Sequence, residues 1–208
     1  MQMDIQTLNK ALGNIDLYLL DQILKGRFDP SMKVLDAGCG EGRNLSYFIQ
    51  NGYEVHGVDT NPSAIQMLKF VASSLNRAID KHNFQVAPVE KLPYEGAYFD
   101  LVICNAVLHF AQNHDHFHAM FSELCRVAKP DAYIFIRTAS SIGMEDKIKE
   151  IAHGVYHLPD GSHRYLIHRN QAETLTAQFG LAYIESFKTV VVDAMRSMST
   201  LICRKSAQ

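Results

Sequence analysis

Closely spaced glycines and two acids give this sequence its clearest candidate for chemistry. Residues 34–45 read VLDAGCGEGRNL, in which glycine occupies every second position from 38 to 42 and follows Asp36. Without a Cβ, such a stretch can form a tight turn, cradle a phosphate or let a ligand lie against bare backbone. A second acid, Asp59, ends the next apolar run, where it can bind a ribose. These residues predict a ligand site.

A second candidate lies in a long connection with aromatic and cationic side chains. Residues 153–169 read HGVYHLPDGSHRYLIHR, with a Pro-Asp-Gly turn in the middle. Connections longer than about 12–15 residues are usually lids or binding elements. Aromatic rings and cations suit a small planar or anionic molecule, and Arg164 can pair an anion through two hydrogen bonds. The alternative is that these side chains only cover the edge of a sheet.

Two further patterns suggest chemistry that we do not expect. Residues 109–118, HFAQNHDHFH, place His114 and His118 one helical turn apart, near Asp115 and His109. Polar residues also collect at a helix start, and no second set of ligands follows, so we expect no metal. Cys39 lies between glycines, but no base stands at a telling spacing, so we expect a small side chain tucked under the loop rather than a nucleophile.

The elements that must position these residues alternate between apolar runs and helical patterns. Such an order predicts a doubly wound α/β fold with a mostly parallel sheet, which binds ligands at the carboxyl ends of its strands. Two closing β-rich runs, joined by the short segment DAMRS, predict an antiparallel hairpin between Val190–Val192 and Leu201–Cys203. We expect strands at 33–36, 54–59, 84–86, 99–104 and 132–137, and helices at 15–25 and 44–50, from Asn61-Pro62, from Asn113, and from an Asn170 cap to Gly180.

Composition limits the classes of protein to consider. A chain of 208 residues that is 47% hydrophobic is most simply one domain, 1–208, with a single core. The net charge is −2 and the basic residues are scattered, so we expect no nucleic-acid or membrane partner. The start of the chain lacks a signal-like pattern and the four cysteines form no CxxC pair, which favours a cytoplasmic protein.

One position separates two kinds of ligand. A dinucleotide-binding turn needs a third small residue in its GxGxxG pattern, so that the helix can pack closely on its strand. Here that position is Arg43. The bulky cation argues against a Rossmann-type NAD(P)-dependent oxidoreductase, although that class stays open because Asp59 would serve either ligand.

Four segments in sequence order carry a resemblance to a known family. VLDAGCGEG, VHGVDTNPSAIQML, VEKLPYEGAYFDLVICNAVLHF and ELCRVAKPDAYIFIRT resemble successive motifs of class I S-adenosylmethionine-dependent methyltransferases, from about residue 33 onward. The chain resembles small-molecule members of methyltransferase type 11, and its GEGRN and NGYEV segments are similar to tellurite-resistance-type and thiopurine-type methyltransferases. Two positions depart from the pattern. Pro88 replaces an acid that often contacts adenine, and KPDA replaces the usual KPGG turn.

The resemblance implies a Rossmann-like methyltransferase fold of seven strands and methyl transfer to a small-molecule acceptor by in-line displacement. A base is needed only for a protonated acceptor, and His109 is then the candidate. No Asn-Pro-Pro-aromatic run occupies 105–108, which speaks against nucleobase or glutamine-amide acceptors. The implied cofactor residues are Asp36, Gly38, Cys39, Gly40, Asn44, Asp59, Thr60, Val89, Glu90 and Asn105.

The acceptor side of the site follows from geometry within this family. The methyl group must point towards the carboxyl ends of the fourth and fifth strands, so the segments free to cover it are an N-terminal helical cap, 1–30, and a substrate lid, 138–169. We expect a monomer or homodimer, and a non-catalytic S-adenosylmethionine-binding module remains an alternative. The expected catalytic residues are His109 and Arg164, and the expected acceptor-lining residues are Tyr18, Arg137, His157 and Tyr165.

Overall fold

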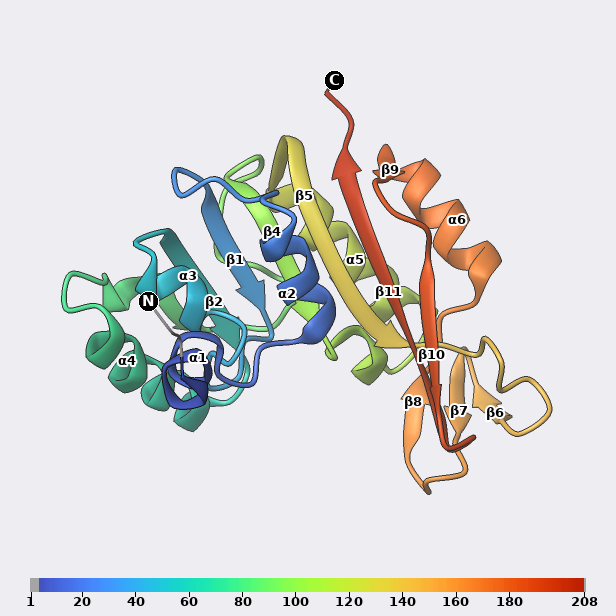
Figure 1. The fold of residues 1–208 in the computed structure, drawn as a ribbon. Helices are drawn as coiled ribbons and strands as arrows, with labels where there is room; N and C mark the ends of the chain where they lie inside the picture. Colours follow the sequence, from blue (N-terminus) through green and yellow to red (C-terminus); the bar gives the residue numbers. More distant parts are fainter. Residues whose placement is uncertain (1–3, 208) are drawn as a thin grey trace.

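The fold is built on one large, mostly parallel sheet (Figure 1). A computed structural model describes residues 4–207, so residues 1–3 of the expected 1–30 cap, and residue 208, lie outside the described part. The strand order is β10-β11-β5-β4-β1-β2-β3, and β9 pairs with β11 as an eighth strand. The strands are β1 (Lys33–Ala37), β2 (Glu54–Asp59), β3 (Phe84–Val86), β4 (Phe99–Asn105), β5 (Ala128–Ala139), β9 (Leu181–Tyr183), β10 (Lys188–Val192) and β11 (Arg196–Lys205).

The predicted fold class is confirmed by the pairing within this sheet. β1 to β5 run parallel to one another, whereas β11 is antiparallel to β5, β9 and β10. The C-terminal hairpin is present, but its register differs from the expected one. Val190 pairs with Met198, so Leu201–Cys203 lie beyond β10 and pair with β5 instead. The turn sets this register, because the strands are separated only by 193–195.

Helices cover both faces of the sheet, as its alternating side chains require. Along β4, Leu101 and Ile103 join one buried cluster and Val102 and Cys104 the other. α2, α3 and α4 pack with the first cluster, and α5 and α6 with the second. The helices are α1 (Ile5–Leu12), α2 (Leu17–Leu24), α3 (Ser46–Gln50), α4 (Pro62–Leu75), α5 (His114–Val127) and α6 (Arg169–Gln178).

Helix starts show which local signals decide the fold. Asn61 and Asn113 cap α4 and α5, each accepting hydrogen bonds from backbone N–H groups of the first turn, as predicted. The predicted cap at Asn170 is wrong, because α6 begins at Arg169 and its N-cap residue, His168, makes no side-chain capping bond. None of the described helices is long and apolar enough to cross a membrane.

The connection after β5 folds into a small sheet of its own. It contains β6 (Lys149–Ala152), β7 (Val155–His157) and β8 (His163–Tyr165), antiparallel in the order β6-β7-β8. Figure 1 shows this sheet beside the carboxyl end of β5 and the start of β11. The segment is therefore ordered, and it adds a wall at the edge where the fold binds ligands.

Candidate active site

The glycine turn after β1 uses its three glycines for two purposes. A Cβ on Gly38 would lie 2.2 Å from Cγ2 of Val107, and one on Gly42 would lie 2.3 Å from Cδ1 of Leu68. Those two positions let the turn pack against its neighbours. Gly40, at φ +51°, has no atom within 4 Å of the position a Cβ would take. Gly40 is therefore the one glycine of this turn whose Cβ position is open, and its N–H is donated to Asp59.

Asp59, at the carboxyl end of β2, is held by the same turn. Its Oδ2 accepts a hydrogen bond from the Gly40 N–H at 2.8 Å, and its Oδ1 accepts one from the Asn61 N–H at 2.8 Å. The carboxylate is half-buried. Each oxygen keeps a lone pair for a further donor, so Asp59 is a fixed acceptor at the rim of a cavity.

A cavity of about 300 Å³ opens between Asp59 and the exit of β4. Of the residues expected to bind cofactor, it brings together Gly38, Asp59, Thr60, Val89 and Glu90. Sequence reasoning did not predict its other wall, which comes from the first two turns of α5. There, His116 Nε2 lies 3.4 Å from Glu90 Oε2. The remaining lining residues are Ala87, Val107, Phe110, His116 and Met120.

Two buried polar side chains at the carboxyl ends of β1 and β4 have no hydrogen-bond partner in the described structure. Asp36 is 1% exposed, and neither of its carboxylate oxygens is paired. The amide of Asn105 is likewise buried and unpaired. Burial raises the pKa of Asp36 to about 7, with Arg43 lowering it and Asp59 raising it further. Unpaired buried polar groups are costly, so this pair points to a polar ligand.

The other expected cofactor residues do not line this cavity; they are Asp36, Cys39, Gly40, Asn44 and Asn105. The Cys39 side chain packs against Gly57, whose Cβ would lie 3.0 Å from its Sγ, and burial raises the pKa of its thiol. Asn44 is buried, and its Oδ1 accepts the Asp16 N–H at 3.1 Å. Its side chain therefore ties the glycine turn to the start of α2.

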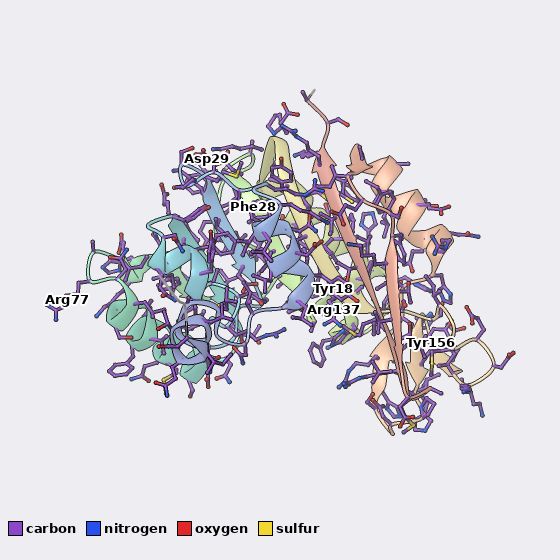
Figure 2. All side chains as sticks on the ribbon, viewed as in Figure 1. Tyr18, Phe28, Asp29, Arg77, Arg137 and Tyr156 are labelled. Atoms are coloured by element: carbon purple, nitrogen blue, oxygen red, sulfur yellow. The ribbon has the colours of Figure 1, made fainter. Side chains whose placement is uncertain are left out.

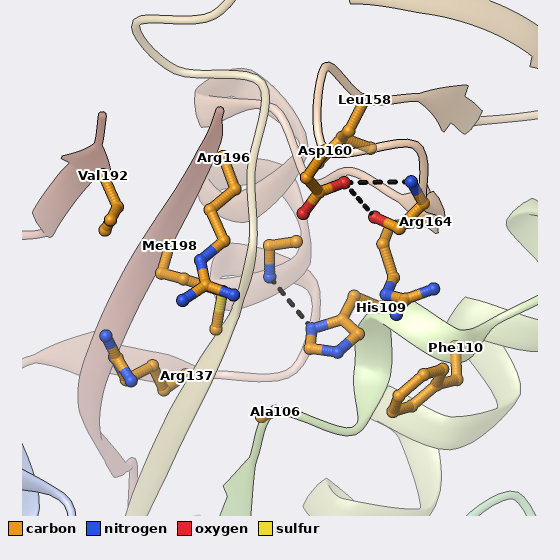
Figure 3. Close-up of a pocket in the computed structure, with 12 residues that line it drawn as sticks. Ala106, His109, Phe110, Arg137, Leu158, Asp160, Arg164, Val192, Arg196 and Met198 are labelled. Atoms are coloured by element: carbon orange, nitrogen blue, oxygen red, sulfur yellow. Dashed lines mark hydrogen bonds between the residues drawn. The ribbon is translucent and has the colours of Figure 1, made fainter. Parts of the chain in front are cut away.

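A second cavity, of about 320 Å³, lies between the exit of β4, the ends of β5 and β11, and the small sheet (Figure 3). It brings together three of the expected residues, His109, Arg137 and Arg164. Phe110 lines both cavities, so they meet at the exit of β4. The other lining residues are Ala106, Ala139, Leu158, Asp160, Ser162, Val192, Arg196 and Met198.

His109 faces this cavity as a neutral hydrogen-bond donor. Its Nδ1 accepts the backbone N–H of Ala139 at 3.3 Å, so the proton of the neutral ring is on Nε2 (Figure 3). Burial, with the nearby Arg164 guanidinium, lowers the pKa of the imidazole to about 4. This arrangement favours a hydrogen-bond donor over the expected general base, and the catalytic role of His109 stays a prediction.

Arg137 and Tyr18 form one contact between β5 and the N-terminal helices. Arg137 Nη1 donates to Asp16 Oδ2 at 3.0 Å, and the guanidinium lies 5.4 Å from the centre of the Tyr18 ring. Figure 2 shows the two labelled side chains next to each other. Tyr18 does not line the cavity and reaches it only through Arg137.

Tyr165 and His157 are not brought to the cavity, in contrast to the expectation. Tyr165 is fully buried, its ring stacks on Phe117 at 4.4 Å, and its hydroxyl lies 2.9 Å from His114 Nδ1. His157 is exposed, beside His163. Successive side chains of a strand face opposite sides, so the residues next to Arg164 in β8 must point away from the cavity.

The histidines of α5 are engaged separately. His114 contacts Tyr165, and His118 Nε2 lies 3.2 Å from Gln178 Nε2. Across the described residues, no three His, Cys, Asp or Glu side chains gather as a metal site would need.

Arg196 is the main residue of this cavity that sequence reasoning missed. It lies at the start of β11, directly after the hairpin turn, and pairs with Val192 in the register. The signal was present in DAMRS, a cation at the tip of a hairpin, but only the pairing of β11 with β5 places that tip beside Arg137 and Arg164.

Comparison with known proteins places this geometry in a family. Residues 35–136 match the model of a methyltransferase domain. An uncharacterised methyltransferase of Schizosaccharomyces pombe is 33% identical over 109 residues, which are 51% of this chain and 71% of that protein. Other curated methyltransferases are longer, and the chain covers 38% and 46% of the length of two of them.

Solved structures share the fold. A SAM-dependent methyltransferase from Methanosarcina mazei has a TM-score of 0.72 at 19% identity, over 89% of this chain and 98% of that one. TehB from Haemophilus influenzae has a TM-score of 0.68 at 17% identity, over 97% of this chain and 65% of that one. At these identities the likeness concerns the fold alone.

Proposed function

This chain belongs to the methyltransferase family, and on that premise we propose that it transfers a methyl group from S-adenosylmethionine to a small-molecule acceptor. The observation that carries the proposal is the pair of cavities that meet at Phe110. One cavity has the groups that a nucleoside needs, and the other is lined by side chains suited to a second reactant.

The residues present fit S-adenosylmethionine group by group. Asp59, already held by two backbone donors, would accept the ribose hydroxyls. The unpaired, buried carboxylate of Asp36 and the amide of Asn105 would take the ammonium end, which gives both a partner. Val89 and Met120 would flank the base, with Glu90 and Thr60 at the rim. Gly38, which lines the first cavity, would let the cofactor approach the backbone of the turn closely.

The chain's own task in the reaction is alignment. When bound, the cofactor supplies a sulfonium-activated methyl carbon, whose C–S bond breaks as the acceptor atom bonds to it and whose bonding electrons stay on sulfur. Holding the reactants in line can supply roughly 7–11 kcal/mol. His109 offers an N–H donor, so we expect it to hydrogen-bond the acceptor rather than to take a proton from it.

The cap and lid also remain proposals. The small sheet within 138–169 would close over the acceptor, since Leu158, Asp160, Ser162 and Arg164 all line the second cavity. The N-terminal helices would act from further away, through Asp16 and its contact with Arg137. We therefore propose that the described part of the predicted cap, residues 4–30, would support the cavity wall rather than roof it.

Calorimetry with S-adenosylmethionine, S-adenosylhomocysteine and NADH tests the assignment. We expect both sulfur nucleosides to bind and NADH not to bind. Asp59→Ala should weaken their binding by about tenfold or more, because each unpaired donor costs about 1–3 kcal/mol. Asp29→Ala is the control, because Asp29 lies in the turn before β1 and away from both cavities (Figure 2). NADH binding alone would support an oxidoreductase, and binding without turnover on a broad acceptor panel would support a non-catalytic module.

A further inference from the structure

Three arginines from three separate elements reach the second cavity. Arg137 comes from β5, Arg164 from β8 and Arg196 from β11. Arg137 is neutralised by Asp16, which lies 3.0 Å away. In Figure 3, Arg164 and Arg196 extend towards the cavity from opposite sides. These two guanidiniums are the ones available to a ligand.

Neither available arginine has a carboxylate within ion-pair distance in the described structure. Arg164 donates from Nη1 to the His163 carbonyl at 2.7 Å and lies over the Phe110 ring, 4.9 Å from its centre. That contact places one guanidinium at the junction of the two cavities. The remaining N–H groups of both side chains are free to bind an oxyanion.

The cavity carries one excess positive charge. Asp160 is the one acid among its described lining residues, and its Oδ1 accepts from the backbone and hydroxyl of Ser162 at 2.9 and 2.6 Å. These bonds lower the pKa of Asp160, so it is ionised at neutral pH. Two unpaired guanidiniums against one carboxylate leave a single positive charge, which matches a monoanion better than a dianionic phosphate ester.

The remaining lining residues are mostly apolar, and the cavity is small. Leu158 and Met198 line opposite parts of the wall, with Phe110 at the junction. Apart from Asp160 and the Ser162 groups bound to it, the polar side chains beside them are donors, including the His109 Nε2–H. A ligand that fits has a compact apolar body and one group rich in hydrogen-bond acceptors.

We propose that the methyl acceptor is a small monocarboxylic acid whose carboxylate lies between Arg164 and Arg196. The role of this acid as methyl acceptor rests on the proposed function. The anion site itself is argued only from the charges and contacts of the cavity. Arg196 thereby becomes a substrate-binding residue, and the C-terminal hairpin becomes part of the active site.

The binding test uses three probes: benzoate, benzamide and phenyl phosphate. Saturation-transfer NMR measures the binding of each probe, with and without S-adenosylhomocysteine. We expect benzoate to bind more tightly than either other probe. Arg164→Gln and Arg196→Gln should each weaken benzoate binding by about tenfold, as loss of a charge-assisted pair predicts. Arg77→Gln is the matched control, because Arg77 is exposed at the far end of the molecule (Figure 2) and should leave binding unchanged.

The outcomes separate this proposal from the methyltransferase assignment. Benzoate that does not bind, binds no better than benzamide, or is unaffected by both arginine variants overturns the carboxylate site. Tighter binding of phenyl phosphate overturns it in favour of phosphate esters. Calorimetry with S-adenosylhomocysteine on the same variants should show unchanged affinity. Failure of that nucleoside to bind the wild-type protein would instead overturn the proposed function.

Discussion

The carboxylate of Asp16 and the guanidinium of Arg137 lie 121 positions apart in the sequence and 3.0 Å apart in space. Asp16 also caps α2, with Oδ1 accepting the N–H groups of Tyr18 and Leu19. One buried side chain therefore starts a helix and fixes an arginine in the wall of a cavity. The N-terminal helices are coupled to that cavity through this residue.

Asp16→Ala should destabilise the protein more than Asp16→Asn. Alanine removes the cap, worth about 1 kcal/mol, and leaves Arg137 without its partner, a loss of roughly 3–5 kcal/mol for a fully buried pair and less here because Arg137 is partly exposed. Asparagine keeps the capping oxygen. Urea unfolding measures the difference, and equal losses in the two variants would show that Asp16 does not act as a cap.

Gly38→Ala and Gly40→Ala should fail in different ways. A methyl group on Gly38 would collide with Val107, so we expect lower stability, by about 1–3 kcal/mol for forced packing alone. A methyl group on Gly40 meets open space, so the expected cost is mainly that of its φ of +51°, about 1 kcal/mol. S-adenosylhomocysteine affinity should fall in Gly40→Ala although it folds, because a changed φ would move the Gly40 N–H that holds Asp59. Thermal unfolding and calorimetry together check this, and the reverse pattern would contradict the placement of the ligand.

Asp36 should make the free protein less stable as pH rises from about 4 to about 7. Its folded-state pKa of about 7 exceeds the ordinary value of 3.8, so the folded protein holds the extra proton in this range. The stabilisation is complete when the pH is below the pKa of Asp36 in the unfolded chain. It is lost as the pH rises through the pKa of Asp36 in the folded protein. Buried His56 and His109, whose pKa values are lowered, act in the opposite direction. The comparison is therefore with Asp36→Asn, whose stability relative to wild type should increase over this range.

The same carboxyl group predicts proton release when cofactor binds. An ammonium beside Asp36 would favour its charged form and lower its pKa. Calorimetry at pH 6 in two buffers of different ionisation enthalpy should detect release of a fraction of a proton by wild type and less by Asp36→Asn. Equal release by both proteins would show that another group is responsible.

His109→Asn should fold normally but transfer methyl groups more slowly. An asparagine Oδ1 can replace Nδ1 as the acceptor of the Ala139 N–H, but nothing replaces the Nε2–H. His109→Leu should also lose stability, by about 1–3 kcal/mol, because the buried N–H is left unpaired. Nitrogen-15 NMR should show a neutral ring protonated on Nε2 across pH 5–8. A ring that titrates near pH 6.5 would restore the general-base hypothesis.

The parallel sheet and the cofactor side of the candidate site could be predicted from the sequence, because both depend on local signals. The local signals are the alternation of strands and helices and caps such as Asn61. They predicted a mostly parallel sheet, with Asp36 and Asp59 at the carboxyl ends of its strands. The acceptor side depends on which face of a short strand each residue takes. Tyr165 and Arg164 are neighbours in β8 with opposite surroundings, and no local pattern distinguished them.

Contacts between segments that are distant in the sequence explain the two remaining differences from the prediction. Arg196 reaches the cavity because β11 adds antiparallel to β5, and Asn44 leaves the cofactor cavity because Asp16 engages its amide. Both contacts join segments that are far apart in the chain. Spacing within one motif therefore carried no information about them.

The division of labour between the two cavities has an evolutionary consequence. The residues that line the first cavity lie between positions 38 and 120, and those that line the second lie between 106 and 198. Phe110 is the one described residue that lines both. Under the proposed function, mutations in the small sheet and the C-terminal hairpin can therefore change the methyl acceptor without disturbing the cofactor site. Inherited diversity of substrates should accumulate in the second half of such chains, while ancestral constraint is concentrated in the first.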